Sequence, residues 1–309
     1  MAICLTGLQS LNLRYRGQFP DSKLEPVKLS DGRYAVSEAT ISDRRFALFR
    51  TQLSAGTVEA NSGLTTAGDN DLYVPVDSKS LRVFSAEKDY AIATKATGVF
   101  RFETRSGDFG YSGDGANNNR RSEMVASGFT YGAGETLWVS FSFVVGPDHV
   151  PFDPAGAVNG QHNIIHQWHS VDTTNSRSPV CNIELNSGNL EVNTRSDSTG
   201  SGPTNKVVHY NSARPTDGTP HSVVISGLLG QSGHLNVWLD GAQILNLDTP
   251  IGYYNDDAGA RDLAYPHWGI YQKNVDDPAV VYHANIEWGT TDLSARIAAP
   301  LTVPALTWL

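Results

Sequence analysis

Residues 161–169 read QHNIIHQWH and concentrate side chains that could do chemistry. Histidine can serve near neutral pH as a general base, a general acid or a metal ligand. Because alternate side chains of a β-strand share a face, Ile165, Gln167 and His169 are predicted to lie together, with Gln167 and His169 about 7 Å apart. Ile164, His166 and Trp168 take the opposite face, where Ile164 and Trp168 favour the core. His166 is therefore interpreted as a buried core histidine.

The same alternation bears on a metal site. It places His162 and His166 on the face opposite His169, whereas zinc needs three or four converging ligands. We therefore expect no catalytic metal. A structural calcium ion remains an open alternative, since acidic loops such as YYNDDAGARD (253–262) and AGDND (67–71) carry the oxygen ligands that calcium prefers.

A second stretch, NNNRRSEMVASG (117–128), places Arg121 and Glu123 on one strand face and Met124 on the other. A glutamate beside an arginine can hold the guanidinium fork in position for an acidic ligand. The alternative is a solvent-facing ion pair, which would contribute little to stability.

A third stretch, AYPHWGIYQKN (264–274), places His267, Gly269 and Tyr271 on one face, with Lys273 following if the strand continues. Trp268 and Ile270 take the core side. A glycine between a histidine and a tyrosine would leave open space on the polar face, as a ligand groove needs. The alternative is an ordinary surface strand that ends in a tyrosine.

The elements that must position these residues are short strands. Apolar and β-branched runs alternate with turn residues, and Asp240-Gly241 marks a hairpin. We predict an all-β fold, a two-sheet antiparallel sandwich or jelly roll with a concave sheet that displays the polar face as a groove. The predicted strands are 98–105, 136–145, 162–169, 180–185, 189–194, 221–227, 234–239, 267–272 and 280–288.

The ends of the chain differ in character from its middle. Residues 1–80 contain short strand-like pieces and a Gly, Ser and Thr stretch, and they are predicted to form an N-terminal extension or small β subdomain. Residues 81–309 are then the jelly-roll domain. The apolar, proline-punctuated tail at 292–309 is predicted to be a strand packed along the body.

Composition excludes several classes of protein. The net charge of −9 argues against a nucleic-acid binder, although a local basic cleft could still take an anionic substrate. No apolar run approaches the length of a membrane span. Two cysteines, Cys4 and Cys181, exclude a disulfide framework, and whether they pair stays open. The Gly-, Ser-, Thr- and Asn-rich composition suggests an extracellular protein without a visible signal peptide, and we expect a monomer.

The order RSE (121–123), QWH (167–169) and HWGIY (267–271) resembles the jelly-roll polysaccharide lyases, including heparin lyase I-like, glucuronan lyase-like and alginate lyase-like enzymes. RFETRSGD (101–108) is also similar to the first strand of the heparin-lyase-like group. The resemblance covers about residues 85–290. It implies a concanavalin A-like jelly roll that cleaves a uronate-containing polysaccharide by β-elimination, with no cofactor.

The resemblance also implies roles for individual residues. His169 matches the base, Gln167 the glutamine that contacts the uronate carboxylate, and Tyr271 the acid. Arg121 and Glu123 match the family's Arg-Glu pair. His267 stands where the family often has lysine, which would make the local positive charge depend on pH. Lys273 could supply some of that charge, and further candidate substrate contacts are Tyr265 and Arg105.

The chemistry explains these residue types. A uronate lyase removes the weakly acidic C5 proton, so groups that neutralise the carboxylate stabilise the enolate-like intermediate, and a base and an acid complete the elimination. Arg121, Gln167 and His267 suit the first task, and His169 and Tyr271 the second, although Tyr271 could serve as both base and acid. Three alternatives remain open: a sandwich glycoside hydrolase, which needs two carboxylates across the bond, a lectin-like binding module, and a structural jelly roll.

Overall fold

The structure is a computed structural model, and it describes residues 27–28, 34–35, 56–57, 71–76, 79–86, 88, 90–96, 99–111, 113–126, 129–132, 134–150, 162–171, 178–186, 188–197, 205–253, 264–273, 277–300 and 303. The chain divides into two compact units, residues 1–47 and 48–309. In the first unit, the described residues form an antiparallel pair of strands, β1 (Val27–Lys28) and β2 (Tyr34–Ala35).

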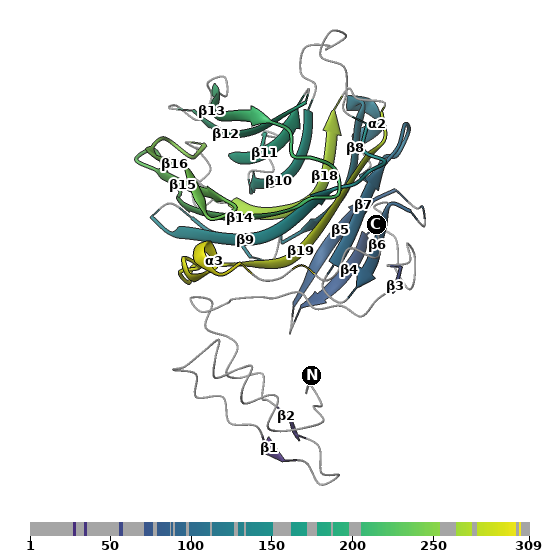
Figure 1. Ribbon diagram of the computed structural model, residues 1–309, viewed down its shortest axis with the longest axis horizontal. Helices are drawn as coiled ribbons and strands as arrows, with labels where there is room; N and C mark the ends of the chain where they lie inside the picture. The colour runs from purple at the N-terminus through teal and green to yellow at the C-terminus, as the bar shows by residue number, and fades with distance from the viewer. Residues whose placement is uncertain are drawn as a thin grey trace. The chain divides into compact units, whose positions relative to one another are not determined.

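The second unit is the predicted all-β jelly roll, built from two stacked sheets (Figure 1). The first sheet carries the three motifs on neighbouring strands. Among the described residues its strands are, in order across the sheet, β13 (Asn205–Ala213), β12 (Asn189–Asp197), β11 (Cys181–Asn186), β10 (His162–Ser170), β18 (Ala264–Lys273), β8 (Asn119–Val125), β5 (Lys79–Ser85) and β4 (Asp71–Val76), while β17 (Gly252–Tyr253) pairs with β12. We call it the groove sheet.

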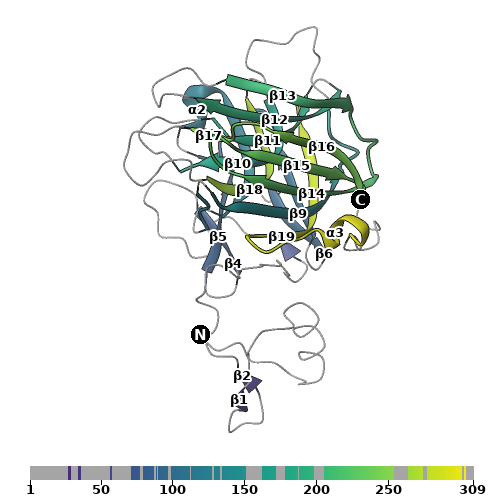
Figure 2. The same ribbon diagram turned by 90° about the vertical axis from the view of Figure 1, so that its left-hand side faces the viewer.

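The second sheet, which we call the back sheet, packs against the groove sheet (Figure 2). Its described strands are, in order, β16 (Ala242–Asp248), β15 (His234–Leu239), β14 (Pro220–Leu228), β9 (Thr136–Val145), β19 (Ala279–Gly289), β7 (Val99–Thr104), β6 (Ile92–Ala96) and β3 (Gly56–Thr57). In the described part of the chain, two short helices accompany the sheets, α2 (Asp114–Asn117) and α3 (Ala295–Ala298). Each predicted strand overlaps an observed one.

The core lies between the two sheets. Every second side chain of their strands points into this space, and these side chains are mostly apolar. Trp168 and Trp268 from the groove sheet are completely buried, as is Trp288 from the back sheet. Trp268 and Trp288 contact across the interface with ring centroids 5.0 Å apart. His166 is buried in the same core against Phe141, with ring centroids 4.8 Å apart, as its position in the sequence predicted. Aromatic contacts of this kind fix the spacing between the sheets.

A β-bulge in β10 corrects one part of the sequence analysis. The register of β10 shifts between Ile164 and His166 relative to both neighbouring strands. An extra residue reverses the alternation of side chains beyond it. Consequently Ile164 and His162 face the same side of the sheet as Gln167 and His169, whereas the sequence analysis placed both on the opposite side.

Gly269 also has a different role from the predicted one. Its φ of +136° is unfavourable for residues with a side chain. A Cβ there would clash with the Ser122 carbonyl oxygen and lie 2.8 Å from the Glu123 Cα. Glycine is therefore required by the close approach of β8 to β18, and it does not create open groove space.

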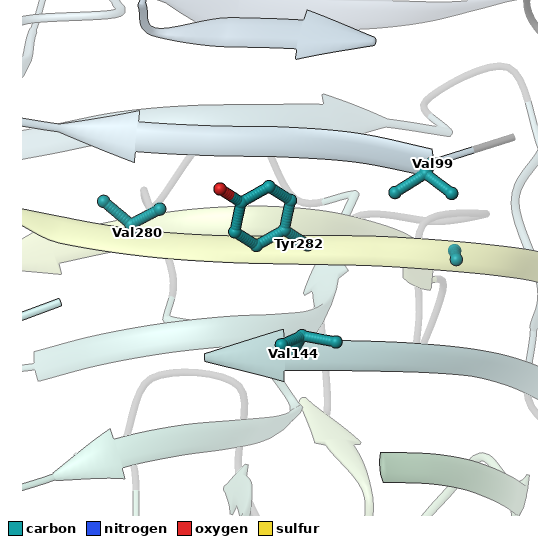
Figure 3. Packing of buried hydrophobic residues seen from close by; sticks show 5 residues of the cluster. Val99, Val144, Val280 and Tyr282 are labelled. Carbon is teal, nitrogen blue, oxygen red and sulfur yellow. The ribbon is translucent and has the colours of Figure 1, made fainter. Parts of the chain in front are cut away.

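The outer face of the back sheet carries an apolar cluster, defined as Val99, Val144, Val280, Tyr282 and Ala284 (Figure 3). Val303 from the C-terminal tail packs against this cluster. The tail therefore contacts the body as predicted, but its described part contains the short helix α3 where a strand was predicted.

The predicted domain boundary at residue 80 stays a prediction. Strands β3 and β4 lie on its N-terminal side, and they pair with β6 and β5 of the two sheets. Within the described residues, no helix is long and apolar enough to cross a membrane.

Candidate active site

The groove sheet brings the three sequence motifs together on adjacent strands, β10, β18 and β8. In the register of these strands, Gln167 lies opposite His267, and Tyr271 lies opposite Arg121. Their polar faces border a cavity of about 380 Å³. The candidate residues that line it are Arg121, Gln167, His169, Tyr271 and Lys273.

Glu123 and His267 form a buried polar layer beside Gln167. The Gln167 Nε2 donates a hydrogen bond of 2.5 Å to Glu123 Oε1, and His267 Nδ1 lies 3.4 Å from the same oxygen. Burial opposes ionisation of Glu123, but His267, Arg121 and Gln167 together hold its pKa below the usual range. This carboxylate therefore fixes the glutamine amide. The same Nε2 lies 3.4 Å from His267 Nδ1, and when that nitrogen donates to Glu123 the second Nε2 hydrogen is left for a ligand.

Arg121 is held mainly by a residue that the sequence analysis missed. Its Nε lies 2.8 Å from Asp114 Oδ2 and its Nη2 lies 2.6 Å from Asp114 Oδ1, which makes a bidentate pair. The predicted pair with Glu123 is present but looser, with 3.7 Å between Nη1 and Oε2. Burial lowers the pKa of Arg121, yet both carboxylates raise it, and the net shift is upward. The guanidinium stays charged, with Nη1 as its least committed nitrogen.

His169 is set up as a neutral base. Its Nδ1 lies 2.8 Å from the Ser170 carbonyl oxygen, which can only accept a hydrogen bond. Nδ1 therefore carries the proton, and Nε2 keeps a lone pair. Burial, together with the nearby His267, lowers the pKa of His169 to about 4. At neutral pH the ring is uncharged.

Tyr271 is set up in the opposite protonation state. Burial raises the pKa of its hydroxyl to about 12, although the neighbouring Arg121 guanidinium acts against this shift. The guanidinium carbon lies 4.8 Å from the centre of the Tyr271 ring, a cation–π contact that orients both side chains. At neutral pH the phenol is protonated and can donate its proton.

The remaining candidates divide between the site and another region. Tyr265 and His169 both stack against His267, with ring centroids 5.1 Å and 5.5 Å from it, so Tyr265 supports the site without lining the cavity. Arg105 does not reach the site, because it follows β7 of the back sheet. There its Nε lies 2.5 Å from Glu103 Oε1, and its guanidinium covers the Tyr90 ring.

Residues 67–287 match the family described as polysaccharide lyase. The chain belongs to the polysaccharide lyase family. This lyase is thus an enzyme, and its family implies an anionic polysaccharide as the substrate. Among curated proteins, none is significantly similar in sequence.

Several solved lyase structures are similar to this chain at low sequence identity. An endo-β-1,4-glucuronan lyase from the fungus Trichoderma reesei is 16% identical, over 78% of this chain and 96% of its own, with a TM-score of 0.48. A family 7 alginate lyase in complex with substrate is 17% identical, over 66% of this chain and 82% of its own, with a TM-score of 0.47. A marine PL7 alginate lyase from Zobellia galactanivorans is 12% identical, over 79% of this chain and 94% of its own, with a TM-score of 0.43.

The cavity of the lyase also contains residues that the sequence analysis missed. Asn119 shares the strand face of Arg121 and Glu123, so period two could have found it. Asp114 lies in α2, outside any periodic pattern, and Arg195 comes from β12, two strands away from β10. Only the fold brings these two to the cavity.

Arg195 belongs to a second charged group around the buried Glu184. Glu184 lies 3.8 Å from Arg195 Nη2, 3.7 Å from His162 Nδ1 and 3.2 Å from Lys206 Nζ. Burial raises the pKa of Glu184, but these partners outweigh it and set the value at about 2. Lys206 also lies 3.7 Å from Glu191 Oε2, so two fixed cations meet two carboxylates in this group, and Arg195 is the cation among them that lines the cavity.

Among the residues that the structure describes, no three histidine, cysteine or acidic side chains are arranged to hold a metal ion. His162 does lie on the same face as His169, so the alternation argument against zinc was wrong for that residue. The two acidic loops proposed for calcium lie outside the described residues, apart from Tyr253 and Asp71, and calcium binding stays a prediction.

Proposed function

We propose that this lyase cleaves a uronate polymer by β-elimination across the C4–C5 bond of the sugar. The observation that carries the proposal is a neutral histidine and a protonated tyrosine lining one cavity with a charged arginine. Base, acid and carboxylate-binding groups are the three parts that this reaction needs.

The first step is neutralisation of the substrate carboxylate. Arg121 Nη1 and the remaining Nε2 hydrogen of Gln167 bind its oxygens, which stabilises the negative charge that develops when C5 loses its proton. Glu123 and Asp114 fix these two side chains, so little reorganisation is needed during the reaction. All of this charge stabilisation comes from side chains, and the mechanism needs no metal ion.

Proton transfer then completes the elimination. His169 Nε2 takes the C5 proton, and the electrons of the C5–H bond form the C4=C5 double bond. The C4–O4 bond breaks, and O4 receives the proton of the Tyr271 hydroxyl. Exchange with water returns both side chains to their starting states. Because the pKa of Tyr271 is high, we assign it the acid role alone and give the base role to His169.

The second charged group supports a substrate with uronates in succession. Arg195 and His162 line the same cavity as the elimination residues, so they are placed to meet a further carboxylate along the polymer. Such polymers are too large to enter a cell, and we therefore place the activity outside it. A single-chain, monomeric enzyme suffices for this mechanism.

A panel of uronate polymers tests the proposal. Glucuronan, alginate and glycosaminoglycans are incubated with the protein, and ultraviolet absorbance follows the unsaturated ends that elimination creates. We expect at least one polymer to give this signal. New reducing ends without any increase in absorbance would mean hydrolysis and would overturn the elimination mechanism.

Substitution of the two proton-transfer residues tests their roles. His169→Ala and Tyr271→Phe are each expected to abolish the absorbance signal with an unchanged circular dichroism spectrum. His234→Ala and Tyr90→Phe are matched controls outside the cavity and should retain full activity. Full activity in Tyr271→Phe would remove the proposed acid.

A further inference from the structure

Two tryptophans lie on the outer face of the back sheet, on the opposite side of that sheet from the core. Trp138 on β9 and Trp238 on β15 flank β14, where they lie opposite Ser226 and Val224. Their rings are nearly parallel, at 8°, with centroids 6.2 Å apart. Both are partly exposed, whereas Trp168, Trp268 and Trp288 are fully buried. A pair of adjacent, partly exposed indoles on a sheet surface is suited to binding a ligand.

Amide and hydroxyl side chains adjoin the indole pair. Asn236 donates to Ser226 Oγ at 3.2 Å, and Gln243 donates to Asn236 Oδ1 at 3.2 Å. Gln243 is exposed, and an amide offers two donor hydrogens and two acceptor lone pairs. The group therefore has hydrogen-bonding capacity left for a ligand with hydroxyl groups. We call Trp138, Trp238, Ser226, Asn236 and Gln243 the tryptophan face.

Charge distinguishes the tryptophan face from the active-site cavity. The strands that form it, β9, β14, β15 and β16, contain no lysine or arginine. Arg296 of α3, which contacts β14, is paired with Glu287 through contacts of 2.6 Å and 3.0 Å. The cavity, in contrast, has Arg121, Arg195 and Lys273 in its walls. A polyanion therefore has partners in the cavity but not here.

Other parts of the same outer face are already covered by the chain itself. Val303 packs on the apolar cluster of β7, β9 and β19, and α3 contacts β14. Val224, which lies opposite Trp238, is buried. The partly exposed indoles therefore lie on the part of this outer face that also carries the amide side chains.

We propose that the tryptophan face binds a neutral hexopyranose chain as an accessory, non-catalytic site. Indole rings stack on the apolar C–H face of a sugar ring, while the amide and hydroxyl groups bond to its hydroxyls. This site would anchor the lyase to a matrix in which the uronate polymer is embedded among neutral polysaccharides. It is independent of the elimination mechanism.

Binding to insoluble cellulose, β-1,3-glucan and β-mannan tests the proposal with the full chain. We expect the protein to sediment with at least one of these polymers, and matching soluble oligosaccharides to change its tryptophan fluorescence. Trp138→Ala and Trp238→Ala should each weaken binding about tenfold. Activity on a soluble uronate substrate should stay the same in both variants.

Val208→Ala is the matched control, because it removes an exposed apolar side chain from the groove sheet and should leave glycan binding unchanged. Unchanged thermal unfolding in the tryptophan variants excludes a general loss of fold. Failure to bind any of the neutral polymers, or binding that survives both substitutions, would overturn the proposal. Tryptophan-dependent binding of polyuronates alone would overturn the neutral-sugar assignment.

Discussion

Substitution of Asp114 by asparagine should reduce turnover although Asp114 is not assigned to touch the substrate. The side chain of Asp114 is 1% exposed, and it receives contacts from Arg121 at 3.0, 2.8 and 2.6 Å. Asparagine keeps the size but removes the charge, and it can turn an NH₂ group toward the guanidinium. Arg121 then loses the bond that orients Nη1 toward the substrate carboxylate.

The size of the effect follows from the bonds that are lost. A hydrogen bond to a charged group contributes about 1.5–3 kcal/mol. Loss of one such bond from the arrangement that stabilises the transition state corresponds to a decrease in kcat/KM of about 10- to 100-fold. Because Arg121 keeps its positive charge, we expect most of the decrease in kcat and little in KM.

The assay measures the initial rate at which unsaturated ends form, with the polymer that the substrate panel identifies as the substrate. Asp108→Asn is the control, since Asp108 is also a buried carboxylate but accepts hydrogen bonds from the Tyr90 hydroxyl and the Arg105 backbone amide, away from the cavity. A double-mutant cycle with Arg121→Ala separates positioning from a general structural effect, because Asp114→Asn should cost nothing further once Arg121 is absent. A folded Asp114→Asn variant with kcat within twofold of the native value would refute the reasoning.

Three further predictions concern pH and backbone. As pH rises, kcat/KM should increase through a pKa of about 4, where His169 loses its proton, and fall again near 12 as Tyr271 ionises; an acidic limb at neutral pH would contradict the base assignment. Gly269→Ala should lower the free energy of unfolding by about 3 kcal/mol or more, measured by urea denaturation, whereas Gly188→Ala, with φ +83° and no atom within 4 Å, should cost about 1 kcal/mol. Burial lowers the pKa of His149 to about 4 and of His283 to about 3. As the pH falls below 6.5, these histidines are therefore protonated in the unfolded chain before they are protonated in the folded protein, which favours unfolding. Lowering the pH from 7 to 5 should therefore decrease the free energy of unfolding by about 2 kcal/mol for each of these two histidines. Equal urea midpoints at the two pH values would count against this prediction.

Period-two alternation was sufficient to predict most of the candidate site. It placed Arg121 with Glu123 and His267 with Tyr271, because β8 and β18 continue regularly through both pairs. It failed in β10, where the register shifts between Ile164 and His166 and no glycine or proline within β10 itself marks the change, although Gly269 of the neighbouring β18 lies at the shift. Parity arguments therefore hold only up to the nearest bulge.

The partners of the site residues could not be predicted from spacing. Asp114 precedes Arg121 by a short helix, and Arg195 reaches the cavity from a strand that is not adjacent to any motif strand. Both contacts depend on tertiary structure. Arg105 shows the reverse error: the stretch that resembles the first strand of the heparin-lyase-like group belongs to the back sheet, where Arg105 pairs with Glu103.

The low pKa of His169 and the high pKa of Tyr271 arise from one environment, and a bound substrate carboxylate should raise both pKa values. Burial disfavours the charged form of both side chains, while Arg121 disfavours the imidazolium and favours the phenolate. An ionised carboxylate bound to Arg121 adds a negative charge beside both groups. It raises the pKa of His169 and makes Nε2 a stronger base at the moment when C5 must be deprotonated. It also keeps the Tyr271 hydroxyl protonated until the leaving oxygen develops charge, so binding of the uronate itself prepares base and acid for elimination.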